Sequence, residues 1–316
     1  MERCDFLPVS AEEMHERGWW WYDALVVGGD AYVDHPSFGT AVISRVLEAE
    51  GLRVAVLAQP DWHDAEAFRA MGRPRLGVFI GAGNLDSMVA HYTAAKRRRS
   101  EDFYSPGKRT GCRPDRAAIV YCNRAREAFG PDMPIILGSL EASLRRFAHY
   151  DYWDDAVRRA ILFDAPADLL VYGMGEAATI EIARRLKKKQ SVRTMTDIPG
   201  TGYITRDPAV CKFEHITLPS FEDVRDDKRL YAEATRTEYA EHDPIRGRAM
   251  IQPCEGRCLV INPPAMPLDT KELDRVAELP YTREWHPMYE PLGGVPAIEE
   301  VRFSVIHNRG CFGGCN

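Results

Sequence analysis

Two cysteines near the end of the sequence have a spacing that suits a metal or iron–sulfur site. Cys311 and Cys315 are separated by Phe312-Gly313-Gly314. Thiolate sulfur is the usual protein ligand of iron–sulfur clusters and a common ligand of zinc. The glycine pair permits a loop to pass close to a small inorganic group and to direct amide N–H groups toward its sulfur atoms. We therefore identify Cys311 and Cys315 as the candidate metal ligands.

The element that must position these thiols is the apolar run 301–306, which is rich in β-branched and aromatic residues. Such a run predicts a strand. It leads through Arg309-Gly310 directly into the first cysteine, so the two thiols would lie on a loop at the end of that strand. The stretch 293–296, Gly-Gly-Val-Pro, reads as the hinge before it.

Composition limits the class of protein. The chain has 316 residues, 45% of them hydrophobic and 28% charged, which allows about two soluble globular domains. A net charge of -6 provides no general case for nucleic-acid binding. No apolar run is long enough to span a membrane, and none near the N-terminus resembles a signal peptide. We therefore expect a cytoplasmic protein with neither a nucleic-acid nor a membrane partner.

The eight cysteines allow a competing metal site. A long chain without a secretion signal favours reduced thiols or metal ligands over disulfides. Cys254 and Cys258 form a second pair with the spacing of Cys311 and Cys315. Two such pairs could make a tetrahedral zinc site with four cysteine ligands. A structural zinc protein is thus one alternative.

The first 190 residues alternate short apolar strands with amphipathic helices. This alternation predicts a doubly wound α/β fold with a mostly parallel, Rossmann-like sheet. The predicted strands are 24–30, 53–57, 76–80, 134–138 and 168–173. The predicted helices are 40–50, 64–71, one after a cap at Asn84, 116–129, 141–147, 154–163 and 175–186.

Glycines follow four of these strands, at 28–29, 81–83, 138 and 173–175. In open α/β sheets the carboxyl ends of the strands line the crevice in which ligands bind, and glycine there permits close backbone approach. The pattern lacks the complete dinucleotide fingerprint. The second alternative is therefore a binding module for a nucleotide or a cobalamin-like ligand, unless these glycines only make tight turns.

For two sets of polar residues near these strand ends, we predict structural roles. His35 lies in the stretch Asp34-His35-Pro36, and we expect it to cap or pack near the edge of the sheet. Glu141, Arg145 and Arg146 could contact a substrate, but we expect a structural ion-pair cluster.

Several motifs together resemble a known family. The segment 309–315, R-G-C-F-G-G-C, is similar to the start of the cluster loop of radical S-adenosylmethionine (SAM) enzymes, C-x-x-x-C-x-aromatic-C. Further motifs resemble the YgiQ-type radical SAM proteins: L-R-R-F-A-H-Y-D-Y-W (144–153), A-D-L-L-V-Y-G-M-G-E (167–176), N-P-P-x-x-P-L (262–268) and L-P-Y-x-R-x-x-H-P (279–287).

The resemblance implies three parts. These are a Rossmann-like, cobalamin-binding-like domain at 1–190, a bridging segment at 191–292, and the first strand of a radical SAM barrel with its cluster loop at 293–316. The spacing around His35 does not match the cobalamin-binding motif D-x-H-x-x-G, so cobalamin binding is not carried over.

The resemblance also implies a chemistry for the full-length protein. A [4Fe-4S] cluster and SAM would be its cofactors, and a donor such as flavodoxin or ferredoxin would reduce the cluster. Reductive cleavage of SAM would yield a 5′-deoxyadenosyl radical that acts on an unknown substrate. Cys311 and Cys315 match two of the three cluster ligands, and the third falls beyond Asn316. We therefore expect the 316-residue chain to be inactive by itself.

Overall fold

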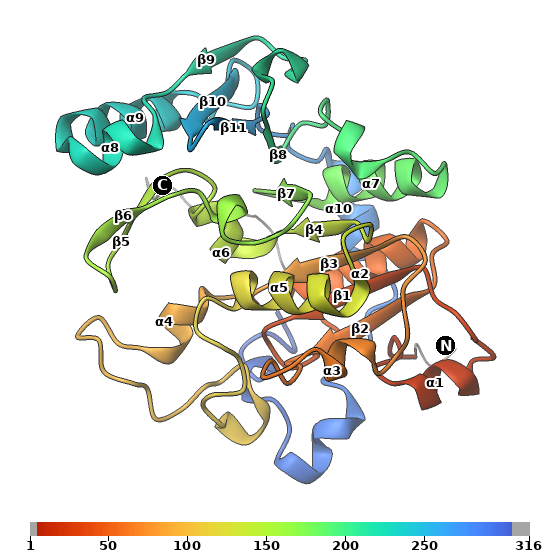
Figure 1. The fold of residues 1–316 in the computed structure, drawn as a ribbon. Coiled ribbons are helices and arrows are strands. Elements are labelled where there is room, and N and C mark those ends of the chain that lie inside the picture. The colour runs from red at the N-terminus through yellow and green to blue at the C-terminus, as the bar shows by residue number, and fades with distance from the viewer. Residues whose placement is uncertain (1–4, 305–316) are drawn as a thin grey trace.

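A nine-stranded mixed sheet forms the centre of the molecule. The structure, a computed structural model, describes residues 5–304. The strand order is β2-β1-β3-β4-β7-β8-β11-β10-β9, which can be followed from β2 up to β9 in Figure 1. The strands of this sheet are β1 Ala24–Gly28, β2 Val54–Ala58, β3 Gly77–Gly81, β4 Ile135–Leu137, β7 Leu169–Val171, β8 Thr201–Thr205, β9 His215–Thr217, β10 Ala249–Cys254 and β11 Arg257–Ile261.

The parallel half of the sheet contains the five predicted strands. β2, β1, β3, β4 and β7 run in one direction, and every residue of β1, β4 and β7 is buried. Burial on both faces explains why these strands read as continuous apolar runs. The mostly parallel, doubly wound core is thus present, and it continues into further strands.

Helices cover both faces of the parallel half. α2 and α7 contact each other, and α2 packs on β1 and β2. α5 packs on β3, β4 and α3, and it lies in front of the sheet in Figure 1. The helices are α1 Ala11–Glu16, α2 Gly39–Ala49, α3 Glu66–Arg69, α4 Ser87–His91, α5 Ala117–Phe129, α6 Ser139–Leu144, α7 Glu176–Lys187, α8 Phe221–Asp226, α9 Lys228–Ala240 and α10 Thr270–Ala277. Short 3-10 turns are η1 Pro106–Lys108, η2 Ile161–Phe163, η3 Val192–Thr194, η4 Pro208–Val210, η5 Pro287–Leu292 and η6 Pro296–Ile298.

Two buried apolar clusters correspond to the two faces. Val26, Phe79 and Ile136 belong to the cluster beneath α2 and α7. Val27 and Ile80 belong to the opposite cluster beneath α5. This alternation follows from the strand geometry, because successive side chains point to opposite faces.

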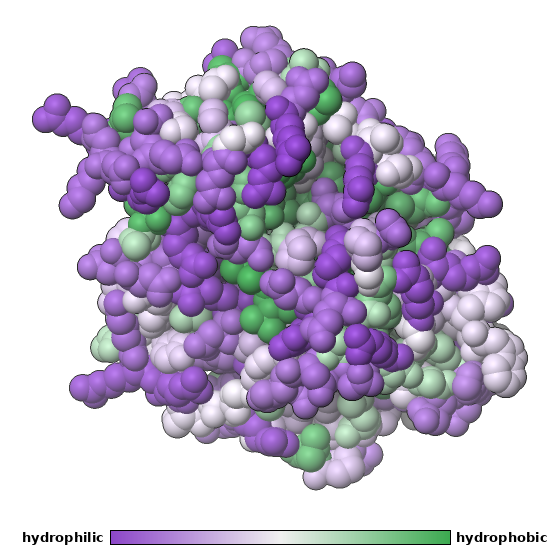
Figure 2. Space-filling view, viewed as in Figure 1, coloured by the Kyte–Doolittle hydropathy of each residue, from purple (hydrophilic) through white to green (hydrophobic). Residues whose placement is uncertain are grey.

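The segment 191–292 extends the same sheet. β8 pairs antiparallel with β7, and β11 and β10 continue the ladder. α8 and α9 lie beside this end of the sheet, at the top of Figure 1. They cover a small cluster of their own that includes Phe221 and Val224. The face seen in Figure 2 is mostly hydrophilic, with apolar surface confined to small patches.

The helix predicted at 154–163 was wrong. The segment contains β6 Ala156–Arg158, which pairs with β5 His149–Asp151 as a separate hairpin, and then η2. The Asp151 carboxylate accepts hydrogen bonds from the amides of Trp153 and Asp154. The same contact can also cap a helix, but Asp155 adopts a left-handed backbone with φ of 51°, and residues 156–158 pair with β5, so a helix does not continue.

The predicted cap at Asn84 was also wrong. Asp86 caps α4, because its carboxylate accepts from the amides of Met88 and Val89. Asn84 instead accepts from the amide of Gly39 at the start of α2. It therefore links two loops at the carboxyl edge of the sheet.

The strand predicted at 301–306 was wrong in its described part. Residues 301–303 form a turn, in which the amides of Val301 and Arg302 donate to the Ile298 carbonyl. A strand requires a neighbouring strand to accept its amides, and here the preceding 3-10 turn accepts them. Residues 305 and 306 lie outside the described residues.

Candidate functional site

A cavity of about 290 Å³ lies at the carboxyl ends of the parallel strands. From β1 the chain passes to β2 on one side and later to β3 on the other, so the strand order reverses at β1. Ligands of open α/β proteins bind at such a point. The lining residues are Val26, Val27, Pro36, Ser37, Gly39, Thr40, Val42, Ile43, Phe79, Ile80, Gly81, Gly83, Ile136, Gly138, Ser139, Val171, Gly173, Met174, Gly175, Glu176 and Thr179.

A row of glycines across the sheet makes this space. Gly28 pairs in register with Gly81, and Gly138 continues the row because it follows Leu137, the partner of Ile80. The row behind it, Val26, Phe79 and Ile136, is large and apolar. The carboxyl end of the sheet therefore carries no side chains along this row, and the cavity occupies the space that side chains would fill. The glycine-rich strand ends noted in the sequence do come together.

Close packing explains why glycine is needed at some positions of this row but not at all of them. A Cβ at Gly28 would lie 2.8 Å from the Thr40 hydroxyl oxygen, and one at Gly81 would lie 3.2 Å from the Ser139 Cβ. The nearest atom to a Cβ at Gly138 would be the Val171 carbonyl oxygen, at an ordinary contact distance of 3.7 Å. The missing side chain of Gly138 therefore leaves room that no neighbour fills.

Ser139 begins α6 in a left-handed backbone conformation, with φ of 74°. Residues other than glycine adopt this region at an energetic cost, and such strain is frequent at functional sites. The Ser139 hydroxyl oxygen accepts a 3.0 Å hydrogen bond from the amide of Ala82. The sequence analysis missed this residue, because a Gly-Ser pair after a strand does not by itself indicate a left-handed serine.

A buried ion pair stabilises the loops on the β1 and β3 side of the cavity. Arg113 Nη1 lies 2.6 Å from Asp30 and Nη2 lies 2.5 Å from Asp102. Asp30 also accepts from the amide of Asn84 at 2.6 Å. The guanidinium thus links the end of β1, the loop after β3 and the loop containing Asp102.

The predicted group of Glu141, Arg145 and Arg146 is structural in part. The buried Glu141 carboxylate accepts from the amides of Ser87 at 2.8 Å and Ala118 at 3.1 Å, and burial raises its pKa. Arg145 forms an ion pair with Asp86. Arg146 does not join them. It approaches the His242 ring at 3.1 Å and donates to the Ser143 carbonyl.

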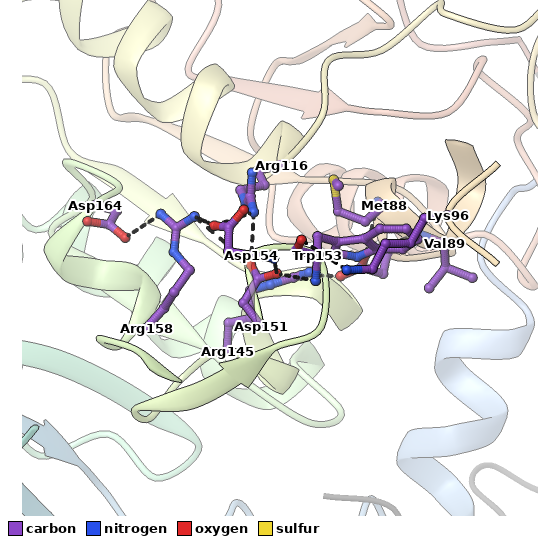
Figure 3. Close-up of polar contacts among 11 residues, drawn as sticks. Met88, Val89, Lys96, Arg116, Arg145, Asp151, Trp153, Asp154, Arg158 and Asp164 are labelled. Carbon is purple, nitrogen blue, oxygen red and sulfur yellow. Dashed lines mark hydrogen bonds and ion pairs between the residues drawn. The ribbon is translucent and has the colours of Figure 1, made fainter. Parts of the chain in front are cut away.

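Ion pairs also attach the β5–β6 hairpin to α5. Arg116 approaches Asp151 at 3.0 Å and Asp154 at 2.8 Å, and Arg158 lies between Asp154 and Asp164 (Figure 3). These contacts use charged residues within and next to the motif at 144–153. We assign them a structural role, because each charge has a partner of opposite sign.

His35 packs as expected. The residue is buried, and its Nδ1 accepts from the amide of Ser37 at 3.1 Å. Burial, assisted by the charge of Arg283, lowers the pKa of the imidazole. Next to it, Asp34 pairs with Arg45 and accepts from the amide of Thr282, which ties the loop after β1 to a distant segment.

The candidate ligands Cys311 and Cys315 lie outside the described residues. Within residues 5–304, no group of histidine, cysteine, aspartate or glutamate side chains is arranged to hold a metal ion. In the β10–β11 hairpin, Cys254 pairs with Arg257 and Cys258 pairs with Pro253. Adjacent positions of a strand pair point to opposite faces, and the two thiols indeed join different apolar clusters. Cys254 and Cys258 therefore cannot ligate the same zinc ion, and the predicted four-cysteine site is wrong.

Comparison with known proteins identifies the family. The Radical SAM N-terminal family model matches residues 6–304. The chain belongs to this family. It is 52% identical to a UPF0313 protein of Clostridium botulinum strain 657, over all of this chain and 49% of the relative. It is 52% identical to a UPF0313 protein of Clostridium perfringens strain 13, over all of this chain and 48% of that relative. The chain thus spans about half the length of the curated relatives it matches.

A solved structure is also similar. It is the radical S-adenosylmethionine methyltransferase TsrM from Kitasatospora setae, with cobalamin and a [4Fe-4S] cluster bound. The likeness covers 57% of this chain and 26% of TsrM, with 18% identity and a TM-score of 0.37.

Within residues 5–304, no helix has the length and apolarity needed to cross a membrane.

Proposed function

We propose that this chain is the N-terminal part of a radical SAM iron–sulfur enzyme of the YgiQ type. One observation carries the proposal. In a member of the Radical SAM N-terminal family, the matched region at 6–304 is followed directly by the pair Cys311 and Cys315. The parts would be a Rossmann-like domain at 1–190, a bridging segment at 191–292 and the start of the catalytic core at 293–316.

The donor set suits an iron–sulfur cluster. Cys311 and Cys315 would supply two thiolates, and Gly313 and Gly314 would let the loop approach the cluster closely. The bound cluster would supply the one electron needed for cleavage of the S–C5′ bond of SAM to methionine and a 5′-deoxyadenosyl radical. This radical would take a hydrogen atom from the substrate.

The 316-residue chain would be inactive by itself. Two thiolates leave the cluster one protein ligand short, and within residues 5–304 no group of three or more potential ligand side chains is arranged to hold a metal ion. The third thiolate, the SAM-binding residues and the contact with a flavodoxin or ferredoxin would belong to the longer protein. We place that protein in the cytoplasm.

The test uses the full-length protein. After anaerobic reconstitution with iron and sulfide, it should bind iron and form 5′-deoxyadenosine from SAM when a chemical reductant is present. Cys311→Ser should abolish this product, whereas Cys254→Ser, in the β10–β11 hairpin, should leave it unchanged. Formation of 5′-deoxyadenosine by the Cys311→Ser protein at the unchanged rate would contradict the assignment.

A further inference from the structure

We infer that the cavity beside Gly138 binds an uncharged, ring-bearing small molecule of about the size of a nucleoside. This inference goes beyond the proposed function, because it concerns a site made by residues 26–179 and does not depend on an iron–sulfur cluster. The flat apolar part of the molecule would lie against the sheet. Hydroxyl groups at the rim would determine its orientation.

The floor of the cavity is suited to a flat ring. Val26, Phe79 and Ile136 come from three adjacent strands and lie side by side in register. All three are at most 4% exposed and point to the same face. Val42 and Ile43 of α2 line the cavity as well. A planar ring between the sheet and α2 would contact apolar side chains on both sides, as ring systems do in ligand pockets.

The size of the cavity suits a ligand smaller than a dinucleotide. Its volume of about 290 Å³ lies at the lower end of ordinary ligand pockets, roughly 300–1,000 Å³. A ring with a small polar substituent fits such a space. A dinucleotide would extend along the crevice well beyond the glycine row.

The charges near the cavity disfavour an anion. Among the described lining residues there is no lysine, arginine or histidine, and the one ionisable side chain is Glu176, an acid. The buried arginines nearby are already neutralised, Arg113 by Asp30 and Asp102, and Arg145 by Asp86. The amide of Gly39, at the start of α2, donates to Asn84. A phosphate or carboxylate would therefore find no cationic side chain among the described lining residues. It would have only backbone amides at the starts of α2 and α7 to replace its hydration, and the acid Glu176 stands in the first turn of α7.

The rim offers oriented hydroxyl groups. Thr40, Ser139 and Thr179 line the cavity. The Ser139 oxygen accepts from Ala82, so its own proton remains available for donation to a ligand. The Ser139 hydroxyl lies beside the space left by Gly81, because a Cβ at Gly81 would be 3.5 Å from the Ser139 hydroxyl oxygen. Backbone strain such as the left-handed conformation of Ser139 persists where the surrounding structure supports it, and it is concentrated in ligand sites.

Saturation-transfer NMR with defined probes tests the inference. The probes are indole and quinoline, each paired with a carboxylated analogue, indole-3-carboxylate and quinoline-4-carboxylate. The 316-residue chain should transfer saturation to both neutral rings. It should bind each carboxylate at least about tenfold more weakly, because the cavity lacks a counter-charge.

Filling the cavity from the protein side provides the matched variant. Gly138 has extended backbone angles, φ -144° and ψ -156°, which valine readily adopts. Gly138→Val should raise the Kd for indole at least about tenfold, by occupying the space. Gly138→Ala should have a smaller effect. Ala58→Val is the control, because Ala58 pairs with Gly28 in the same row but does not line the cavity.

Three results would overturn the inference: no saturation transfer to either neutral ring, unchanged indole binding by a folded Gly138→Val protein, or equal binding of the carboxylates. Circular dichroism and the Tm of each variant establish that it is folded. If Gly138→Val does not fold, the decision rests on Gly138→Ala and on the neutral and charged probe pairs. A Cys311→Ser, Cys315→Ser double variant should bind indole normally, which separates this site from the proposed cluster.

Discussion

Arg113 and Asp30 are 83 residues apart in the chain, yet their charged groups lie 2.6 Å apart in the interior. Asp102 lies on the other side of the same guanidinium at 2.5 Å. The three residues are at most 4% exposed. This pairing attaches the long loop before α5 to the carboxyl edge of the sheet, next to the cavity.

Removing this guanidinium should strongly destabilise the protein. Arg113→Met leaves two buried carboxylates without a counter-charge, so we expect the free energy of unfolding to fall by about 3–5 kcal/mol. Urea denaturation at neutral pH measures it. The control is Arg184→Ala, which breaks a more exposed ion pair with Glu50 and should cost less than about 1 kcal/mol. A loss of unfolding free energy in Arg113→Met as small as the loss in the control would contradict a stabilising role for the buried ion pair.

The glycines at the carboxyl edge should differ sharply in their tolerance of a methyl group. A Cβ at Gly29 would lie 2.0 Å from the Ala82 carbonyl oxygen, so Gly29→Ala must displace the backbone of a neighbouring loop. We expect a loss of at least about 1–3 kcal/mol, or failure to fold. The new methyl group in Gly138→Ala meets only an ordinary contact. The free energy of unfolding of this variant should therefore differ from that of the natural chain by less than about 0.5 kcal/mol. Thermal unfolding of the two variants side by side decides the matter.

The left-handed conformation of Ser139 predicts an unusual order of stability. Ser139→Gly and Ser139→Ala both lose the hydroxyl that accepts from Ala82, but only glycine adopts a φ of 74° without strain. Ser139→Gly should therefore be more stable than Ser139→Ala, by about 1–2 kcal/mol. Urea unfolding of the pair measures the difference. The reverse order would mean that this serine is not strained.

Glu238 predicts a pH dependence of stability. Burial raises the pKa of this carboxyl to about 8, and the charge of Arg146 opposes the shift. The unfolded value is near 4.3, so the folded state holds the proton more tightly. Its contribution to stability is present below about pH 4 and is lost as the pH rises toward 8.

Glu238→Gln imitates the protonated carboxyl at every pH. The variant and the natural chain should therefore be similarly stable near pH 4, and the variant should be the more stable one at pH 8. Free energies of unfolding at several pH values test this. Glu233→Gln, an exposed glutamate on the same helix, is the control for losing one carboxylate. A difference that does not change between pH 4 and 8 would contradict the raised pKa.

The local sequence pattern was sufficient to predict the parallel core of the sheet. The apolar runs of β1, β2, β3, β4 and β7 and the amphipathic helices between them are local signals, because a buried strand and a half-buried helix each impose their own periodicity. The glycines after four of these strands also indicated a crevice at the carboxyl edge. Membership of the Radical SAM N-terminal family agrees with the motifs at 144–153 and 167–176.

The tertiary structure alone decided which distant segments meet. Nothing within β8 or β11 indicates that they extend the same sheet, because strand pairing depends on backbone hydrogen bonds between segments far apart in sequence. The same holds for the alignment of Gly28, Gly81 and Gly138 in one row, which follows from register and produces the cavity. Register likewise places Cys254 and Cys258 on opposite faces, which their spacing in the sequence cannot show.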